Sequence, residues 1–134
     1  LHSNKKFTPI SRYNLTNLFR SMFALELENR LKKTSISVAV AHPGVTKSMQ
    51  SRPYEVKKFK KSFYTYFSTN IQTGIAPIVK AIEQDNVSAD AVHAPRVLGF
   101  YGTPSTMRHN KLVYNKDLRN KLWTFTANEL NLNL

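Results

Sequence analysis

The sequence predicts an α/β protein in which the order is helix, strand, helix, strand, helix, and the two strands are parallel. Residues 35–41 (SISVAVA) are rich in β-branched side chains and carry no charge, which is typical of a buried strand. A helical stretch separates this segment from the second strand candidate, and strands joined through a helix run parallel with a right-handed crossover. Two strands are too few for a stable parallel sheet covered on both faces, so we expect the sheet to lack strands.

The first helix is expected from Thr8 to about Lys33. Thr8 suits the N-cap and Pro9 the first turn. Glu26 and Arg30 are four residues apart and can pair on its outer face. One apolar stripe at helical spacing supports this helix: Leu15, Leu18, Met22 and Leu25.

The first strand is expected at residues 35–41, and it ends at His42-Pro43-Gly44. Its larger side chains alternate on one face, and smaller ones fill the other, where a helix can pack closely. The larger ones are Ile36, Val38 and Val40, and the smaller ones are Ser37, Ala39 and Ala41.

A second helix is expected from about Phe63 to Gln84, and Gly74 and Pro77 can divide it into two pieces. The second strand is expected at residues 96–101, with polar loops over 85–95 and from Gly102 to about Asn115. A last amphipathic helix is expected over residues 116–131.

Composition excludes several classes of protein. A chain of 134 residues suits one domain over 1–134. The absence of cysteine rules out disulfides and thiolate metal sites. The histidines are scattered without metal-ligand spacing, and no carboxylate pair suited to glycosidase chemistry is evident, so we expect no metal site.

The charge balance favours anionic partners. Twenty Lys and Arg against eight Asp and Glu give a formal net charge of +12. Such a surplus favours association with nucleic acid, acidic lipid or a phosphorylated cofactor, without selecting among them.

Residues 45–67 form a long basic segment. Its stretch 52–67 interleaves five cations with six aromatic residues, a pattern that can bind single-stranded nucleic acid or lie on an acidic membrane surface. We favour a solvated segment that covers a substrate site, with membrane contact second and nucleic acid third.

The ordered motifs resemble one known family. Residues 11–27, the strand 35–41 and the turn His42-Pro43-Gly44 together resemble the C-terminal half of the short-chain dehydrogenase/reductase family, above all its retinol-dehydrogenase-like and WW-domain-oxidoreductase-like members. The helix positions that match are Phe23, Glu26, Leu27, Arg30 and Leu31. Residues 72–76, 100–102 and 122–123 also resemble that family's tail.

The resemblance implies a partial Rossmann-like fold, the C-terminal half of a doubly wound parallel sheet. It implies a fragment or degenerate member of the NAD(P)-dependent oxidoreductases, which move a hydride between nicotinamide and a small apolar alcohol or carbonyl substrate. NAD or NADP would be the cofactor, and residues 45–67 would match the family's variable substrate lid.

In this family a tyrosine donates or accepts the proton, and Tyr13 matches it. A free phenol ionises only near pH 10, so the family places a lysine one helical turn further on. Asn17 occupies that position and supplies no positive charge. The resemblance thus assigns Tyr13 and Asn17 to the catalytic positions, and no residue matches the family's catalytic serine.

The resemblance assigns Pro43, Gly44, Val45 and Ser48 to cofactor binding, with Ser48 at the position of a family threonine. The glycine-rich phosphate-binding turn of the family is absent from the sequence. We therefore expect weak or no cofactor binding, and no activity, by this chain alone, so its status as an enzyme is left open.

Two further expectations concern partners. The strand over residues 36–41 has an open edge where a preceding strand would pair, which predicts self-association. The alternative to an oxidoreductase fragment is a non-enzymatic basic module that binds nucleic acid or an acidic membrane surface.

Overall fold

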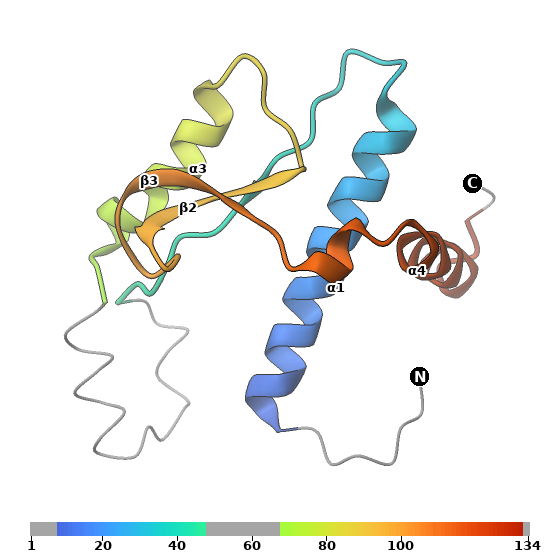
Figure 1. Cartoon of the computed structure of the whole chain (residues 1–134), viewed down its shortest axis with the longest axis horizontal. Helices are drawn as coiled ribbons and strands as arrows, with labels where there is room; N and C mark the ends of the chain where they lie inside the picture. Colours follow the sequence, from blue (N-terminus) through green and yellow to red (C-terminus); the bar gives the residue numbers. More distant parts are fainter. Residues whose placement is uncertain (1–7, 48–67, 133–134) are drawn as a thin grey trace. The chain divides into compact units, whose positions relative to one another are not determined.

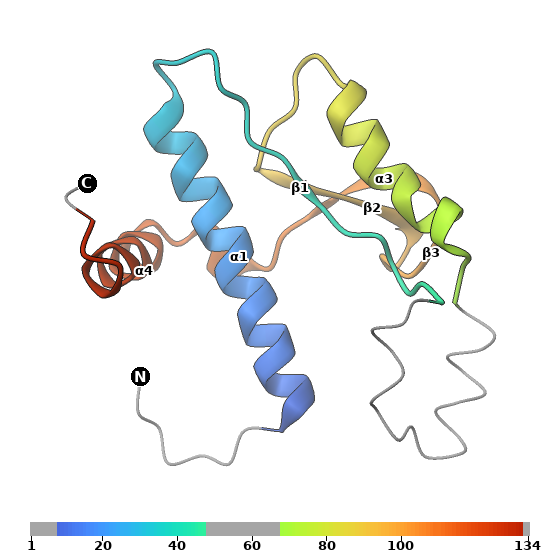
Figure 2. The ribbon, with the colours of Figure 1, turned by 180° about the vertical axis from the view of Figure 1, so that it is seen from behind.

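The computed structural model of the chain describes residues 8–47 and 68–132, which fall in two compact units. One unit comprises Leu1–Ile36 and His109–Leu134, and the other comprises Ser37–Arg108. Helices α1, η2 and α4 belong to the first, and β1, α3, β2 and β3 to the second (Figures 1 and 2). One domain over residues 1–134 stays a prediction.

Helix α1 spans Pro9–Leu31, in agreement with the predicted first helix. The Thr8 hydroxyl accepts the Ser11 N–H at 3.2 Å, which satisfies one of the backbone donors that a helix start leaves without a partner. The N-cap that the sequence predicts is therefore the one that the helix uses.

Helix α1 packs against the 3₁₀ helix η2 (Lys111–Tyr114) and against α4 (Lys116–Glu129). Asn115 caps α4 by accepting the Leu118 N–H at 3.1 Å. Apolar side chains from all three elements make the core of this unit: Met22, Leu25, Val113 and Ala127.

The sheet has three strands in the order β1-β2-β3, namely β1 (Val40–Ala41), β2 (Ala91–Val97) and β3 (Tyr101–Arg108). β1 pairs with β2 in parallel, with Val40 opposite Val92, and β2 pairs with β3 antiparallel. Parallel pairing of the first two strands is confirmed, and the mixed α/β class with it. The predicted order of helix, strand, helix, strand, helix was wrong in lacking the third strand, β3.

The position predicted for the second strand was wrong. Residues 96–101 hold the hairpin between β2 and β3, and the supposed loops over 85–95 and after Gly102 contain most of these two strands. Leu98 and Gly99 have φ values of 51° and 75°, and the Phe100 N–H donates to the Val97 carbonyl. Two successive positive φ values are the mark of a tight hairpin turn whose twist matches the strands.

The first strand is shorter and more exposed than predicted. Only Val40 and Ala41 pair within the described sheet, and Ile36, expected in a buried strand, has 59% of its surface exposed. The segment keeps the residue pattern of a central strand although it lies at the edge of the sheet.

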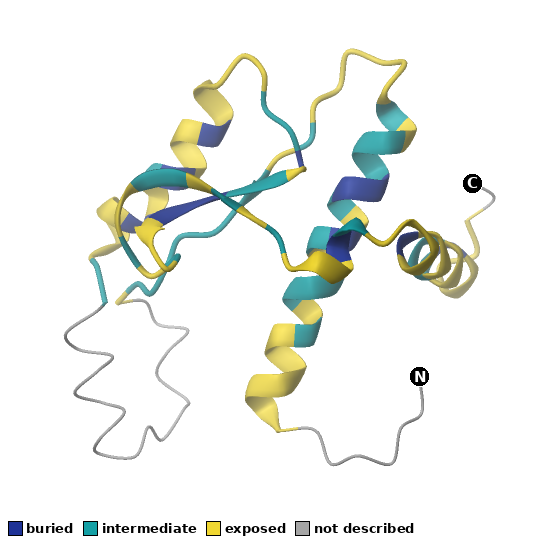
Figure 3. Cartoon of the chain, viewed as in Figure 1, coloured by how far each residue is buried: buried dark blue, intermediate teal, exposed yellow. Residues whose placement is uncertain are grey.

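Helix α3 spans Ile71–Glu83 and is continuous through Pro77, so the proline does not divide it. Gly74, Pro77 and Ala81 are its buried residues and recur every three or four positions, which places them on one face against the sheet. The rest of α3 is mostly exposed (Figure 3). No helix within residues 8–47 and 68–132 is long and apolar enough to cross a membrane.

Candidate functional site

The turn after β1 is held by a local hydrogen bond. Gly44 has a φ of 75°, and its N–H donates to Nδ1 of His42 at 2.9 Å. A positive φ is readily adopted by glycine and disfavoured for other residues. The sequence His42-Pro43-Gly44 therefore forms a compact turn at the carboxyl end of β1, which is the end at which parallel sheets bind ligands.

The backbone of this turn is already bonded within the protein. The Val45 N–H donates to the Phe100 carbonyl at 3.1 Å, and the Val45 carbonyl accepts the Thr69 N–H at 2.8 Å. A Cβ atom on Gly44 would lie 2.4 Å from the same Phe100 oxygen. These groups fit a nicotinamide only if they first release their protein partners, so Gly44 and Val45 do not form a ready cofactor site.

Tyr13 and Asn17 lie one turn apart on α1. Tyr13 is exposed to 53%, and Oδ1 of the half-buried Asn17 accepts a hydrogen bond from Nη1 of Arg20 at 3.5 Å. Arg20 lies seven residues after Tyr13, so the two share one face of the helix. A positive charge thus stands two turns along the helix from the phenol.

Arg20 is a residue that the sequence interpretation missed. The signal was available, because a spacing of seven residues on a helix returns to the same face.

The predicted site residues fall in both units. Tyr13 and Asn17 belong to the helical unit, and Pro43, Gly44 and Val45 belong to the sheet unit. Ser48 and most of the predicted lid lie outside the described residues. The assembly of these residues into one site therefore stays a prediction.

Acidification tests the His42 contact. Burial lowers the pKa of the His42 imidazole below its ordinary value of 6.5, and only an unprotonated Nδ1 can accept the Gly44 N–H. Below pH 6.5 the unfolded chain takes up the proton before the folded one does. The free energy of unfolding should therefore fall as the pH drops from about 6.5 through the lowered pKa, by about 1.4 kcal/mol for each pH unit between the two values.

Urea unfolding at a series of pH values measures this decline. His42→Asn is the matched variant, because an asparagine oxygen can accept the N–H two residues on without titrating. A decline of equal size in the variant would contradict the assignment to His42.

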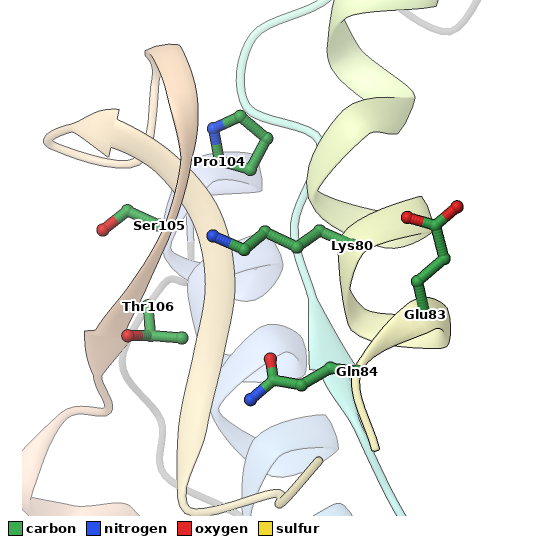
Figure 4. A pocket seen from close by; sticks show the side chains of 6 residues that line it. All are labelled: Lys80, Glu83, Gln84, Pro104, Ser105 and Thr106. Atoms are coloured by element: carbon green, nitrogen blue, oxygen red, sulfur yellow. The ribbon is translucent and has the colours of Figure 1, made fainter. Parts of the chain in front are cut away.

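An open polar pocket lies between α3 and β3, and none of the predicted site residues lines it (Figure 4). Lys80 extends from α3 toward the strand, where Ser105 and Thr106 carry hydroxyl groups. The other lining residues are Glu83, Gln84 and Pro104. The lining combines a cation, a carboxylate and hydroxyl groups, so it does not indicate one kind of ligand. Among the residues that the structure describes, no group of three or more His, Cys, Asp or Glu side chains could hold a metal ion.

Comparison with known proteins shows the fold and no more. No protein-family model matches the chain, and no curated protein is similar to it. A crystal structure of an uncharacterized protein from Mycobacterium paratuberculosis is similar, with a TM-score of 0.68 and 17% sequence identity. The match covers 93% of this chain and 40% of that one, so this chain spans about two fifths of the length of that neighbour.

Proposed function

We propose that this chain is the C-terminal part of an NAD(P)-dependent short-chain oxidoreductase, or a degenerate descendant of one. The observation that carries the proposal is the parallel pairing of β1 with β2, with the Pro43-Gly44 turn at the carboxyl end of β1. That end of a parallel sheet is where nucleotides bind in doubly wound folds. We propose with it that the fold is the C-terminal half of a Rossmann-like, doubly wound sheet.

In the complete enzyme, the exposed Tyr13 phenol would exchange a proton with the alcohol or carbonyl oxygen of the substrate. Asn17 would hold a hydrogen-bonding position, with Arg20 bonded to its side-chain oxygen. Pro43, Gly44, Val45 and Ser48 would border the nicotinamide. In this chain alone the groups of Gly44 and Val45 bond to protein atoms instead, so we expect NAD and NADP to bind weakly or not at all.

A chimera tests the proposed ancestry. The N-terminal half of a characterised short-chain dehydrogenase, ending with its serine-bearing strand, is joined to Leu1, and NADPH oxidation is followed with an aldehyde substrate. With Asn17→Lys, we expect measurable turnover, and Tyr13→Phe in the same background should lower kcat by about 10²-fold or more, because it removes the proton donor.

Tyr101→Phe is the matched control, because it removes a phenol from β3 instead. A folded chimera that turns over equally with and without the Tyr13 hydroxyl would contradict the proposal. Calorimetric titration of residues 1–134 alone should give no low-micromolar dissociation constant for NADPH, and such a constant would contradict the expected loss of the cofactor site.

A second candidate function rests on the net charge of +12. A basic module would bind an oligonucleotide or anionic vesicles with an affinity that falls steeply as salt rises, since each phosphate contact releases counterions. The same titrations with these two probes at 50 and 200 mM salt separate this candidate from the oxidoreductase fragment.

A further inference from the structure

A pair of lysines stands two and three residues before a hydroxyl residue at two places in the sequence. Lys5-Lys6 precedes Thr8, and Lys32-Lys33 precedes Ser35. Protein kinases select their substrates by charge patterns of this kind, and those that require positive charges before the acceptor are the basic-directed kinases. The sequence pattern does not separate the two places, whereas the structure does.

The hydroxyl of Thr8 is engaged at the start of α1. It accepts the Ser11 N–H at 3.2 Å as the N-cap, and Pro9 is already the first residue of the helix. Phosphoryl transfer needs an acceptor oxygen that is free to stand in line with the phosphate. A kinase could reach Thr8 only by removing the cap and unwinding the first turn, so this position is a poor acceptor.

Ser35 lies in an exposed segment that follows the end of α1. Residues 32–37 are exposed and lie outside the helices and strands, as Figure 3 shows for the chain that leaves α1. No hydrogen bond joins the Ser35 hydroxyl to another residue within the described ranges 8–47 and 68–132. Ser35 therefore combines the charge pattern with a free and accessible acceptor oxygen.

The neighbouring Thr34 does not compete with Ser35. Its hydroxyl donates to the Leu31 carbonyl at 2.8 Å and accepts the Ile36 N–H at 3.2 Å. Leu31 also stands three residues before it, where the pattern requires a positive charge. Both features of the site thus favour Ser35 over Thr34.

Ile36 adds an apolar contact directly after the acceptor. Its side chain is 59% exposed, so a partner gains from covering it. In an extended chain, Lys33 and Lys32 stand about 7 and 10 Å before Ser35. The segment therefore fits a groove with carboxylates at these two distances from the transfer point and an apolar pocket on the other side.

We propose that Ser35 is a phosphorylation site for a basic-directed serine/threonine protein kinase. The kinase binds Lys32 and Lys33 through carboxylates and Ile36 in an apolar pocket, with residues 32–36 extended. Extension releases the hydrogen bonds of the Thr34 hydroxyl, which are exposed, and leaves the core of the helical unit in place.

The step transfers the γ-phosphoryl group of ATP. A carboxylate of the kinase accepts the proton of the Ser35 hydroxyl, and Oγ forms a bond to the γ-phosphorus. The bond between that phosphorus and the β–γ bridging oxygen breaks, and ADP leaves with Mg²⁺. The product carries about −1.5 to −2 charges at residue 35, beside two lysines that offset the unfavourable place of an anion after a helix C-terminus.

Phosphorylation of residues 1–134 by the catalytic subunit of cyclic-AMP-dependent protein kinase, with MgATP, tests the proposal. Tandem mass spectrometry should locate phosphate on Ser35, and Ser35→Ala should lose it. Lys32→Ala and Lys33→Ala should each lower kcat/KM for this site at least tenfold, because each removes one charge pair with the kinase. Lys121→Ala is the matched control, since it removes an exposed lysine from α4, and it should leave kcat/KM unchanged.

A synthetic peptide of residues 30–38 tests accessibility separately. If the segment is as open as the structure shows, kcat/KM for the intact chain should lie within about tenfold of the value for the peptide. All the substituted side chains are exposed, so circular dichroism of the variants should match that of the original chain.

Four outcomes would overturn the proposal: no phosphate on Ser35, more phosphate on Thr8 than on Ser35, a kcat/KM that neither lysine substitution lowers, or a peptide that is phosphorylated when the intact chain is not. None of these measurements depends on a nicotinamide cofactor, so the inference stands or falls apart from the proposed function.

Discussion

Replacing Glu26 with alanine is expected to lower the free energy of unfolding of the helical unit by about 3–5 kcal/mol. Glu26 is only 7% exposed, and its two carboxylate oxygens receive Nε of Arg30 at 3.0 Å and Nε of Arg119 at 3.3 Å. Arg119 is 4% exposed and has this carboxylate as its counter-charge. Without Glu26, the buried guanidinium keeps its hydrogen bond to the Val113 carbonyl, at 2.9 Å, but loses its counter-charge.

The single tryptophan of the chain reports this loss. Trp123 stacks on Phe23 with ring centroids 5.0 Å apart, and the Arg30 guanidinium lies 4.4 Å from the Trp123 ring centroid. Its fluorescence should therefore follow urea unfolding of the contact between α1 and α4. Glu129→Ala, which removes an exposed carboxylate from α4, is the control and should change the unfolding free energy by less than about 0.5 kcal/mol.

A double variant separates the buried charge from the loss of packing. Replacing both Glu26 and Arg119 with leucine removes both charges, and such replacements of buried ion pairs are often close to neutral. We expect the double variant to be more stable than Glu26→Ala, so the two substitutions should not add. A loss below 1 kcal/mol in Glu26→Ala would show that water reaches Arg119.

The helices could be predicted because their signals are local. Thr8 and Pro9 mark the start of α1, and Lys116 starts α4 where the sequence places it. The pair Glu26–Arg30 was also predicted from its spacing. Its burial was not, because Arg119 reaches Glu26 from 93 residues further along the chain.

Strands β2 and β3 could not be predicted because they carry the residues of loops. Pro95 and Pro104 lie directly opposite each other in the antiparallel pair. Proline lacks the N–H of a ladder, so it argues against a central strand. Within the described residues β1 pairs with β2 only at Val92 and His93. Pro95 is therefore tolerated, because no described strand pairs with β2 on that side at this position. The hairpin turn has Leu98-Gly99 at its centre, whereas the sequence pair that predicts such turns is Asn-Gly.

The candidate site was predictable as a motif but not as a set of contacts. Pro43-Gly44 after an apolar run identifies a strand-end turn from sequence alone. What occupies the space beside Gly44 is Phe100, from the distant hairpin, and no local pattern predicts that contact. Resemblance assigned this space to a cofactor, whereas in the sheet unit it holds a carbonyl oxygen.

Gly44→Ala is expected to lower the free energy of unfolding of the sheet unit by about 4 kcal/mol. The φ of 75° alone disfavours alanine by about 1–2 kcal/mol. The added Cβ would also lie 2.4 Å from the Phe100 oxygen and 2.8 Å from Cγ of Pro95. Since that oxygen accepts the Val45 N–H, the methyl group and this hydrogen bond cannot both be accommodated.

Gly99→Ala is the matched control, because Gly99 has the same φ of 75° but a Cβ there meets only the Met107 sulfur, at 3.6 Å. Gly99→Ala should lower the free energy of unfolding only by the cost of placing alanine at a positive φ, about 1–2 kcal/mol. Amide hydrogen exchange over residues 91–108 measures both variants in the sheet unit. Equal losses would mean that the Phe100 carbonyl moves aside readily, and the turn would then be free to receive a ligand. The larger loss in Gly44→Ala would instead mean that the turn is fixed against the hairpin and that a cofactor could enter only by displacing it.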